Sequence, residues 1–489
     1  MKNKVLLLKI ENESVYNPLG LLYVGSYLKN NGYEVGLEII PSTLFLNAAD
    51  IQKKAKTIAE NDYLFVGFSV LSGPQTKYSA ILSKEIKKIN SKTCVVWGGI
   101  HPSLLPRETL SEDYVDMIVI GEGERIALGL ADALSRGKDL GSVKGIGYKK
   151  EKELIFSSEQ EMIKDMDDIS IDWSLVDMQR CLLDIPGTGE KGFIYLTSRG
   201  CPHDCSFCYN RIFNKRKWRV HSIERVVKDI EELKKDCGIN TISFMDDHFF
   251  VNRSRSFEIL SRLKAIGISC SEFLLRVDEI TEESVKRLDD LGVKRIFIGI
   301  ESGNDRILSL MDKNTTRKMI LEKFSILSKY KNIAVTSAMI IGYPTETLKE
   351  IKDSISLGLK LSKMIPGIVV TYQTFLPYPG TDAYELAIRE GFKPPLSTEG
   401  YDIYDSFGNS MPLSWLPWAD EKTRILFYRI DKYGKLLTHS KSSSLIRSIG
   451  KKVFYYLAKF RLKNMFFLFP FEIAILFKFN RYYNPGSKI

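Results

Sequence analysis

Short apolar runs alternate with stretches of helical periodicity through the first part of this chain. The runs predict strands, and the amphipathic stretches between them predict helices. The predicted strands are Val5–Ile10, Glu34–Ile40, Tyr63–Ser69, Thr93–Trp97 and Asp116–Ile120, with helices near 18–31, 51–60, 75–90 and 123–135. Because the connections are short, this alternation predicts a doubly wound, Rossmann-like α/β domain over residues 1–150, whose ligands bind at the carboxyl ends of the strands.

A second alternation covers residues 191–400, after a stretch of little periodicity at 151–190 that we interpret as a linker. The predicted strands lie at 193–198, 240–245, 270–275, 294–300, 333–341 and 368–375. Repeated β/α units predict a full or partial parallel barrel, with chemistry at the carboxyl ends of its strands. Beyond the barrel the alternation stops, and residues 401–489 are predicted to form a helical region rich in basic and aromatic residues.

Cys201, Cys205 and Cys208 follow the first strand of the predicted barrel in the spacing Cys-x3-Cys-x2-Cys. Thiolates suit iron–sulfur clusters or zinc, and one short loop can bring three of them to one metal centre. Three thiolates would bind three irons of a [4Fe–4S] cluster and leave the fourth iron open. The alternative is structural zinc with His203 or a distant residue as fourth ligand, but such sites usually gather cysteines as two separated pairs, and no second pair is present. A disulfide fits less well, because seven cysteines are an odd number and nothing marks the chain as secreted.

This cysteine loop at the mouth of a predicted barrel resembles the radical S-adenosylmethionine (SAM) superfamily over roughly residues 190–380. The resemblance implies that the open iron chelates the amino and carboxylate groups of SAM. An electron, supplied by a donor of flavodoxin or ferredoxin type, then cleaves SAM to methionine and a 5′-deoxyadenosyl radical. The cofactors carry this chemistry, and the protein contributes positioning and electrostatics.

The resemblance also implies SAM contacts at successive strand ends. Phe207 stands where an aromatic residue lies near the adenine, and Arg276 could hold the SAM carboxylate. Asp246-Asp247 replaces a Gly-Gly-Glu run that meets the SAM amino group, so the acidity is kept and the contact is left open. The other expected contacts, for the ribose and the adenine, are Glu301, Ser302, Gly342 and Glu346.

The first domain resembles cobalamin-binding domains. Ser69-Val70-Leu71 ends its third strand and Gly98-Gly99 follows its fourth, matching the Ser-x-Leu and Gly-Gly elements of that family. Small residues there let the backbone approach the nucleotide tail of cobalamin. The further implied contacts are His101, which orders its loop or touches the corrin rim, and Glu122 in the loop after the fifth strand.

The family's Asp-x-His-x-x-Gly element is changed in this chain to Gly20-Leu21-Leu22-Tyr23-Val24-Gly25. Gly25 is kept, but Gly20 replaces the aspartate and Leu22 the histidine. Leucine cannot ligate cobalt, so cobalamin here would lack a protein imidazole on its lower face. A Rossmann nucleotide site is the alternative, but no Gly-x-Gly-x-x-Gly follows the first strand, and a domain that no longer binds a cofactor is another.

Together the two domains resemble B12-dependent radical SAM enzymes. The methylthiotransferase branch fits poorly, because its first domain carries three cluster cysteines and this one has only Cys94. The resemblance implies methylation of an unactivated carbon through the 5′-deoxyadenosyl radical and methylcobalamin. The alternatives are a cyclase or hydroxylating enzyme acting on a tetrapyrrole or lipid and, in another class, a non-catalytic corrinoid- or cluster-binding sensor. No general acid or base can be named from the sequence.

The net charge of +10 is concentrated at the end of the chain. Residues 441–489 hold ten Lys/Arg against one acid, Glu472, so the preceding residues are nearly neutral and lack the basic face that nucleic-acid binding needs. Basic residues mixed with aromatics, and the apolar segment Met465–Phe477, predict a peripheral contact with the inner face of an anionic membrane. A helical cap packed on the barrel is the alternative. No signal peptide and no uncharged apolar stretch of spanning length are apparent, so we expect a cytoplasmic protein.

Overall fold

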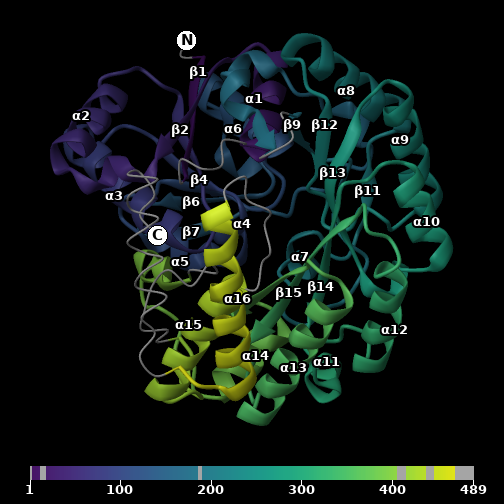
Figure 1. Ribbon diagram of the computed structural model, residues 1–489. Coiled ribbons are helices and arrows are strands. Elements are labelled where there is room, and N and C mark those ends of the chain that lie inside the picture. Colours follow the sequence, from purple (N-terminus) through teal and green to yellow (C-terminus); the bar gives the residue numbers. More distant parts are fainter. Residues whose placement is uncertain (1–2, 12–17, 186–189, 405–414, 437–444, 468–489) are drawn as a thin grey trace. The chain divides into compact units, whose positions relative to one another are not determined.

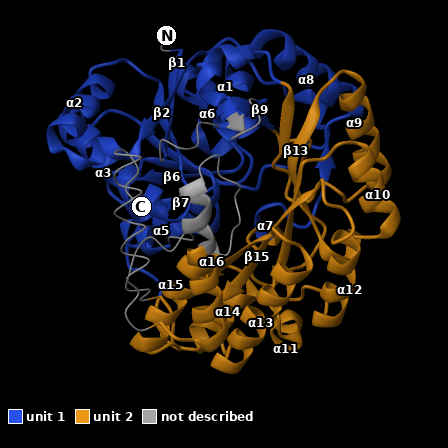
Figure 2. Cartoon of the chain, viewed as in Figure 1, with its two compact units in different colours: residues 1–194, 212–239, 394–404 blue, residues 195–211, 240–393, 405–489 orange. Residues whose placement is uncertain are grey.

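The computed structural model describes residues 3–11, 18–185, 190–404, 415–436 and 445–467, with side chains of the last segment from 453 onward. The chain divides into two compact units (Figures 1 and 2). Unit 1 comprises residues 1–194, 212–239 and 394–404, and unit 2 comprises residues 195–211, 240–393 and 405–489. No helix within the described ranges is long and apolar enough to cross a membrane.

The sheet of unit 1 has seven strands in the order β2-β1-β3-β4-β5-β6-β7. The five strands from β2 to β5 in this order are parallel, as the alternation predicted, and β6 and β7 add an antiparallel edge that it did not predict. The strands are β1 (Lys4–Glu11), β2 (Glu34–Pro41), β3 (Phe65–Ser69), β4 (Val95–Gly98), β5 (Met117–Val119), β6 (Ile146–Lys150) and β7 (Glu153–Phe156).

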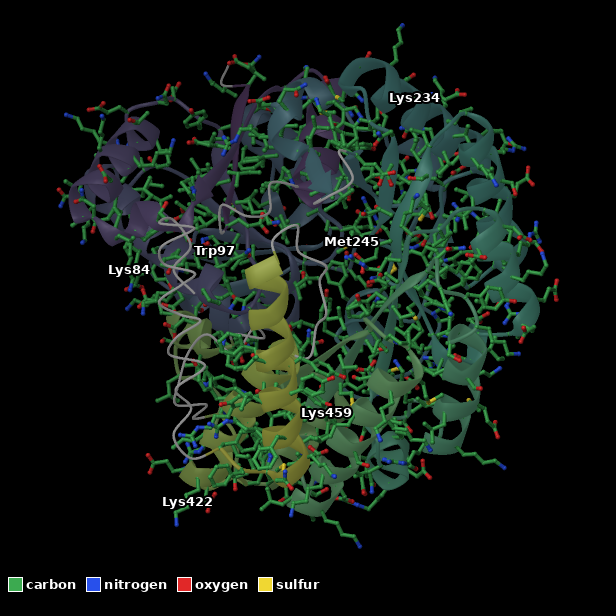
Figure 3. All side chains as sticks on the ribbon, in the orientation of Figure 1. Lys84, Trp97, Lys234, Met245, Lys422 and Lys459 are labelled. Atoms are coloured by element: carbon green, nitrogen blue, oxygen red, sulfur yellow. The ribbon has the colours of Figure 1, made fainter. Side chains whose placement is uncertain are left out.

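Helices cover both faces of this sheet. Successive residues of a strand point to opposite faces, so Leu6 and Leu8 of β1 belong to one core cluster and Val5 and Leu7 to the other. The first cluster includes α2 (Ala48–Ala59) and α3 (Pro74–Ile89), and the second includes α1 (Leu19–Asn30) and α6 (Gly123–Arg136). Trp97 on β4, labelled in Figure 3, is wholly buried. It donates its indole N–H to Ser83 at 3.1 Å. The doubly wound fold is therefore confirmed.

Two later segments complete unit 1. α8 (Ile223–Cys237) comes from residues 212–239, and a 3-10 helix, Thr398–Ile403, packs on α3. There Lys77 pairs with Asp402 at 2.9 Å. Short helices α4 (Ile100–Leu104) and α5 (Pro106–Ser111) follow β4.

Unit 2 is built on parallel strands that alternate with helices. Its strands follow one another in the order β16-β15-β14-β13-β12 and do not close over the described residues, so the barrel is partial. The strands of unit 2 are β12 (Thr241–Phe244), β13 (Ser269–Leu275), β14 (Arg295–Glu301), β15 (Ala334–Ile341) and β16 (Val369–Thr374). The antiparallel strands β8 (Leu183–Ile185) and β9 (Glu190–Tyr195) fall almost wholly within residues 1–194 of unit 1. The helices between and after the strands of unit 2 are α9 (Arg253–Ala265), α10 (Glu282–Asp290), α11 (Asp305–Leu310), α12 (Arg317–Leu327), α13 (Leu348–Met364) and α14 (Asp382–Arg389). The short strand β10 (Ser198–Arg199) belongs to unit 2, and β11 (Arg219–Val220) belongs to unit 1.

The described part of the chain beyond residue 400 is mostly helical, as predicted. α15 (Glu421–Leu436) packs on β16, and α16 (Leu445–Asn464) packs on α15 and α13. Ala458 and Leu462 of α16 are buried in this packing. Residues 468–477 of the predicted apolar segment lie outside the described ranges.

Candidate functional site

The three cysteines of the predicted cluster lie in one loop of unit 2, between β10 and α7 (Asn210–Phe213). All three thiols are free. Gly200 adopts a φ of 88°, and the Cys208 N–H donates to the Cys205 carbonyl at 3.1 Å, so the loop turns back on itself. Burial raises the pKa of Cys208 to about 12, and the nearby Cys205 and Cys201 thiols add to the rise. Bound iron reverses this effect, because it stabilises thiolates, so this gathered donor set fits a cluster.

Asp246, at the end of β12, holds the start of this loop. Its carboxylate is 2% exposed and accepts hydrogen bonds from the Thr197 N–H at 3.1 Å, the Thr197 hydroxyl at 2.7 Å and the Ser198 hydroxyl. Arg255 of α9 donates to the hydroxyl and the carbonyl of Thr197 at 3.1 and 3.0 Å. The three hydrogen bonds to Asp246 therefore come from the two residues that lead into the cysteine loop.

Asp247 holds the loop at two further points. Its carboxylate accepts the Gly200 N–H at 2.9 Å, and the Asn210 side chain donates to it. Gly200 precedes Cys201 and Asn210 follows Cys208, so Asp247 links the two ends of the loop. The acid pair thus serves the cysteine loop directly, and its contact with SAM stays a prediction.

Arg276 lies beside the cysteines, at the end of β13. Its Nη1 is 3.9 Å from Cys205 Sγ, its Nε donates to Asp278 at 3.0 Å, and its Nη2 donates to the Lys313 carbonyl at 3.1 Å. The guanidinium is buried, which places a fixed positive charge next to the thiols. This is the electrostatic setting that an anionic carboxylate favours.

The remaining predicted SAM residues of unit 2 take part in an ion pair, in hydrogen bonds or in the packing of the cysteine loop. Glu301, at a φ of 68°, pairs with the buried Lys313 at 2.6 Å. Ser302 is buried and accepts the Asn304 N–H at 3.2 Å. Glu346 accepts the N–H groups of Gly342 and Tyr343 at 2.7 and 3.2 Å, which closes the turn after β15, and Phe207 is partly buried in the cysteine loop.

One hydroxyl contact ties the cysteine loop to that turn. Ser206 lies 3.0 Å from the Tyr343 hydroxyl, and its own hydroxyl donates to the Leu310 carbonyl at 2.7 Å. The structure thus gathers the cysteines with the ends of β12, β13, β14 and β15, and the SAM contacts of these residues stay predictions.

In unit 1, the predicted cobalamin motifs of β3 and β4 approach each other closely. Gly99 has a φ of 98°, and a Cβ at this position would lie 2.9 Å from the Val70 carbonyl oxygen. Only glycine fits there, which agrees with the Gly98-Gly99 pattern. Leu71 is 39% exposed at the carboxyl edge of the sheet, and Ser69 ends β3.

Leu22 and His101 are both engaged inside unit 1. Leu22 is wholly buried in α1, and a Cβ on Gly25 would lie 3.0 Å from Leu175 Cδ1, while Gly20 has open space around it. His101 is wholly buried, and its Nδ1 lies 2.9 Å from the Ser72 hydroxyl. Burial lowers the pKa of His101 to about 3, so its ring is neutral.

Glu122 forms a buried ion pair with Arg219 that sequence reasoning did not find. The two groups are 2.7 Å apart and both side chains are 8% exposed. Arg219 also donates to the Ile163 carbonyl at 2.9 Å, and the Ile163 N–H donates to Glu122 at 2.9 Å. No sequence motif marks Arg219, because the pair joins residues far apart in the chain. Glu122 also borders a cavity of about 330 Å³ that includes Ser103, Gly121 and Lys215.

Comparison with known proteins agrees with the motifs of each unit. The Radical SAM superfamily model matches residues 195–358, and the B12 binding domain model matches residues 4–131. An uncharacterized methyltransferase of Pyrococcus horikoshii is 31% identical over 396 residues, which are 79% of this chain and 82% of that protein. The chain belongs to the B12-binding radical SAM family.

The chain is also similar in sequence to a further enzyme and in fold to two solved structures. The anaerobic magnesium-protoporphyrin IX monomethyl ester cyclase of Rubrivivax gelatinosus is 25% identical over 75% of this chain and 66% of its own. The structure of the radical SAM methyltransferase TsrM from Kitasatospora setae superposes with a TM-score of 0.67 at 15% identity, covering 94% of this chain and 99% of TsrM. OxsB, a cobalamin-dependent SAM radical enzyme, superposes with a TM-score of 0.69 at 18% identity over 98% and 75% of the two chains. These structures establish the shared fold.

Proposed function

We propose that this cobalamin-dependent radical SAM enzyme transfers a methyl group to an unactivated carbon. The observation that carries the proposal is the loop of three free thiols, held by Asp246 and Asp247 beside the buried Arg276. When bound, the cluster, SAM and cobalamin supply radical generation and a methyl carrier. The similarity to a methyltransferase of Pyrococcus horikoshii supports methyl transfer as the reaction.

The chain's own residues would act by binding and orientation. Cys201, Cys205 and Cys208 would hold three irons of a [4Fe–4S] cluster. Arg276 would hold the SAM carboxylate, and its bond to Asp278 fixes the direction of the guanidinium. In unit 1, Gly99 keeps the backbone close-packed at the carboxyl edge of the sheet, where a cobalamin tail would lie.

A reconstituted enzyme tests this proposal. The full chain, loaded anaerobically with iron, sulfide and cobalamin, should release 5′-deoxyadenosine when SAM and dithionite are added. A reduced donor of flavodoxin or ferredoxin type should replace dithionite. The variant Cys205→Ser should lose this activity and retain bound cobalamin. A wild-type protein that carries the cluster and releases no 5′-deoxyadenosine would support a sensor instead.

A substrate screen by mass spectrometry then separates the reactions. Methyl transfer adds the mass of one methyl group in place of a hydrogen. A ring-closing or hydroxylating enzyme acting on a tetrapyrrole or lipid, such as the cyclase of Rubrivivax gelatinosus that this chain resembles, gives a different mass change. A product without the added methyl carbon would therefore overturn the methylation proposal.

A second proposal concerns α16, which we infer docks on an anionic membrane surface. Val453, Tyr456 and Phe460 are 53%, 65% and 56% exposed. Their spacing of three and four residues places them on one side of the helix, opposite the buried Ala458 and Leu462. Residues 441–489 carry a net charge of +9, which is complementary to anionic lipid headgroups.

Vesicle binding tests this second proposal. We expect the full chain to sediment with vesicles that contain phosphatidylserine and to bind pure phosphatidylcholine vesicles much more weakly. The triple variant Val453→Ser, Tyr456→Ser, Phe460→Ser should lose binding. The matched control Leu396→Ser, which removes an exposed apolar side chain elsewhere, should not. Equal sedimentation of wild type and triple variant would exclude this helix as the docking surface.

A further inference from the structure

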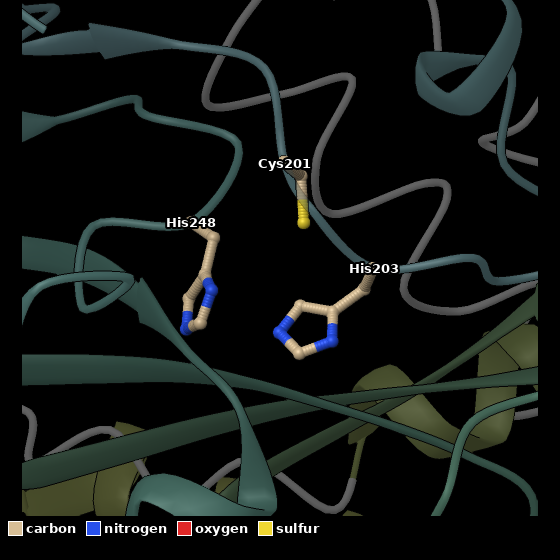
Figure 4. A group of neighbouring side chains, drawn as sticks. All are labelled: Cys201, His203 and His248. Carbon is tan, nitrogen blue, oxygen red and sulfur yellow. The ribbon is translucent and has the colours of Figure 1, made fainter. Parts of the chain in front are cut away.

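Three potential metal ligands meet beside the cysteine loop of unit 2. Cys201 and His203 belong to the loop itself, and His248 follows β12 (Figure 4). One ligand atom of each residue, the Cys201 sulfur and one ring nitrogen from each histidine, lies within 4.8 Å of the other two. The expected cluster uses Cys201 alone of these three, so the two histidines have no role in it.

His248 is the unusual member of this group. It is 1% exposed, and neither of its ring nitrogens has a hydrogen-bond partner among the residues that the structure describes. Its ring centroid is 5.3 Å from that of His203. Buried polar groups without a protein partner are rare in folded proteins, and a bound ion is one of the few explanations for them. A neutral imidazole nitrogen is a common ligand of transition metals.

We propose that Cys201, His203 and His248 bind one divalent zinc-type ion when the loop carries no iron–sulfur cluster. A thiolate with two imidazoles is a donor set that suits zinc, and three protein ligands leave the fourth tetrahedral position to water. Cys201 binds as the thiolate, and its proton is released to solvent. Tetrahedral bonds of about 2.1 and 2.3 Å require ligand atoms roughly 3.3–3.6 Å apart, so the ligand atoms must approach by up to about 1.5 Å, which side-chain rotation can provide.

The charges around this zinc-type site are already compensated. Arg276 and Lys313 both lie near His248 and oppose a cation. Arg276 is paired with Asp278 at 3.0 Å, and Lys313 is paired with Glu301 at 2.6 Å. The thiolate of Cys201 adds the negative charge that the ion itself needs. Because their charges are paired, Arg276 and Lys313 repel a divalent ion at this site only weakly.

The zinc-type ion and the cluster exclude each other, because both require Cys201. Zinc occupying this site would hold the loop in an inactive state until it is removed. The inference does not depend on methyl transfer, and it shares with the proposed function only Cys201. Cluster assembly in the presence and absence of zinc therefore reports on it separately from 5′-deoxyadenosine release.

Cobalt(II) is the probe for this site, added anaerobically to the full-length chain from which iron has been removed. Four-coordinate cobalt with one thiolate gives a charge-transfer band in the near ultraviolet and ligand-field bands in the visible region. The variant Cys205→Ser, Cys208→Ser should lose the cluster and still bind one cobalt with these bands, which zinc displaces. The variant His203→Ala, His248→Phe should bind cobalt at least tenfold more weakly and still assemble the cluster.

The two variants also decide the competing outcomes. Added zinc should lower cluster assembly in the wild type several-fold and leave assembly in the histidine variant unchanged. The proposal is wrong if the loop binds metal through its three cysteines. Two results would show this: cobalt binding that survives loss of both histidines, or loss of cobalt binding in a Cys205→Ser, Cys208→Ser variant that still binds cobalamin. Should the histidine variant not fold, cobalt binding by the cysteine variant alone still distinguishes the two kinds of site.

Discussion

Replacing Asp246 by asparagine should loosen the entry to the cysteine loop. The carboxylate accepts three hydrogen bonds, from the N–H and hydroxyl of Thr197 and the hydroxyl of Ser198. An asparagine has one oxygen to accept them and places an NH₂ group against a donor. Hydrogen bonds to a charged group are worth about 1.5–3 kcal/mol each. Burial opposes the charge, because it raises the pKa of Asp246, so removing the charge offsets part of the loss.

The net destabilisation of this loop should be about 2–4 kcal/mol, which corresponds to roughly a 30- to 1000-fold increase in local opening. Hydrogen exchange followed by mass spectrometry should detect it in peptides covering residues 197–208. Iron content after reconstitution should fall in parallel, while bound cobalamin stays at the wild-type level. The matched control Asp402→Asn, in an exposed ion pair of unit 1, should change neither quantity.

A specific result would refute this account of Asp246. If Asp246→Asn keeps wild-type exchange and iron content and lowers only the affinity for SAM, the carboxylate acts on the cofactor and not on the loop. The same comparison for Asp247→Asn measures the second holding point, at Gly200 and Asn210. Its effect should be smaller, because the structure gives it fewer hydrogen bonds to the loop.

Three further predictions concern stability. Burial raises the pKa of Glu346 from 4.5 to about 8, so its contribution is complete below about pH 4.5 and is lost as the pH rises through 8. Glu346→Gln should remove this loss, of at most about 5 kcal/mol, from thermal unfolding curves between pH 4.5 and 9, and an unchanged pH dependence would contradict it. Gly99→Ala should destabilise unit 1 by more than about 1 kcal/mol and lower cobalamin occupancy measured by visible absorbance, whereas Gly20→Ala, with open space around it, should do neither. Glu122→Gln should lower the free energy of unfolding in denaturant by about 3–5 kcal/mol, because it leaves the charge of Arg219 buried without its carboxylate. The control Lys56→Gln, in an exposed pair, should lower it by less than about 1 kcal/mol, and equal losses of stability would contradict the importance of the buried pair.

The central strands of both sheets could be predicted because each is a short apolar run between amphipathic helices, whereas β8 lies in the stretch 151–190 that was interpreted as a linker. The hairpin of β6 and β7 could not be predicted, because Lys149, Lys150 and Glu151 interrupt the apolar pattern at an edge of the sheet. Edge strands carry polar residues and lack the continuous apolar signal of a central parallel strand. The packing of residues 394–404 on α3 was also missed, since no local pattern reports a contact so distant in sequence.

The candidate site divides in the same way. The cysteine spacing is local, so the loop and its chemistry could be predicted from Cys201, Cys205 and Cys208. What holds that loop is not local, because Asp246 meets Thr197 across 49 residues of chain. A sequence motif shows which residue types occur together, but it does not show which hydrogen bonds they make. For this reason Asp246 and Asp247 were predicted only as SAM contacts.

The Gly20–Gly25 element has no histidine, so any protein imidazole for cobalt would have to come from another residue. The described histidines of unit 1 are His101 and His221, and both have partners. His101 is bound to Ser72, and the ring of His221 lies 3.1 Å from both the Tyr23 hydroxyl and Asp167. Moving the His221 ring to a cobalt ion would break its contacts with the Tyr23 hydroxyl and Asp167, which costs about 1–3 kcal/mol for each group. The Nε2 of His101 has no partner among the described residues, but its ring is wholly buried and packs against Tyr401 at 5.1 Å between centroids. A cobalamin state without a histidine ligand from the Gly20–Gly25 element therefore stays our prediction for this chain.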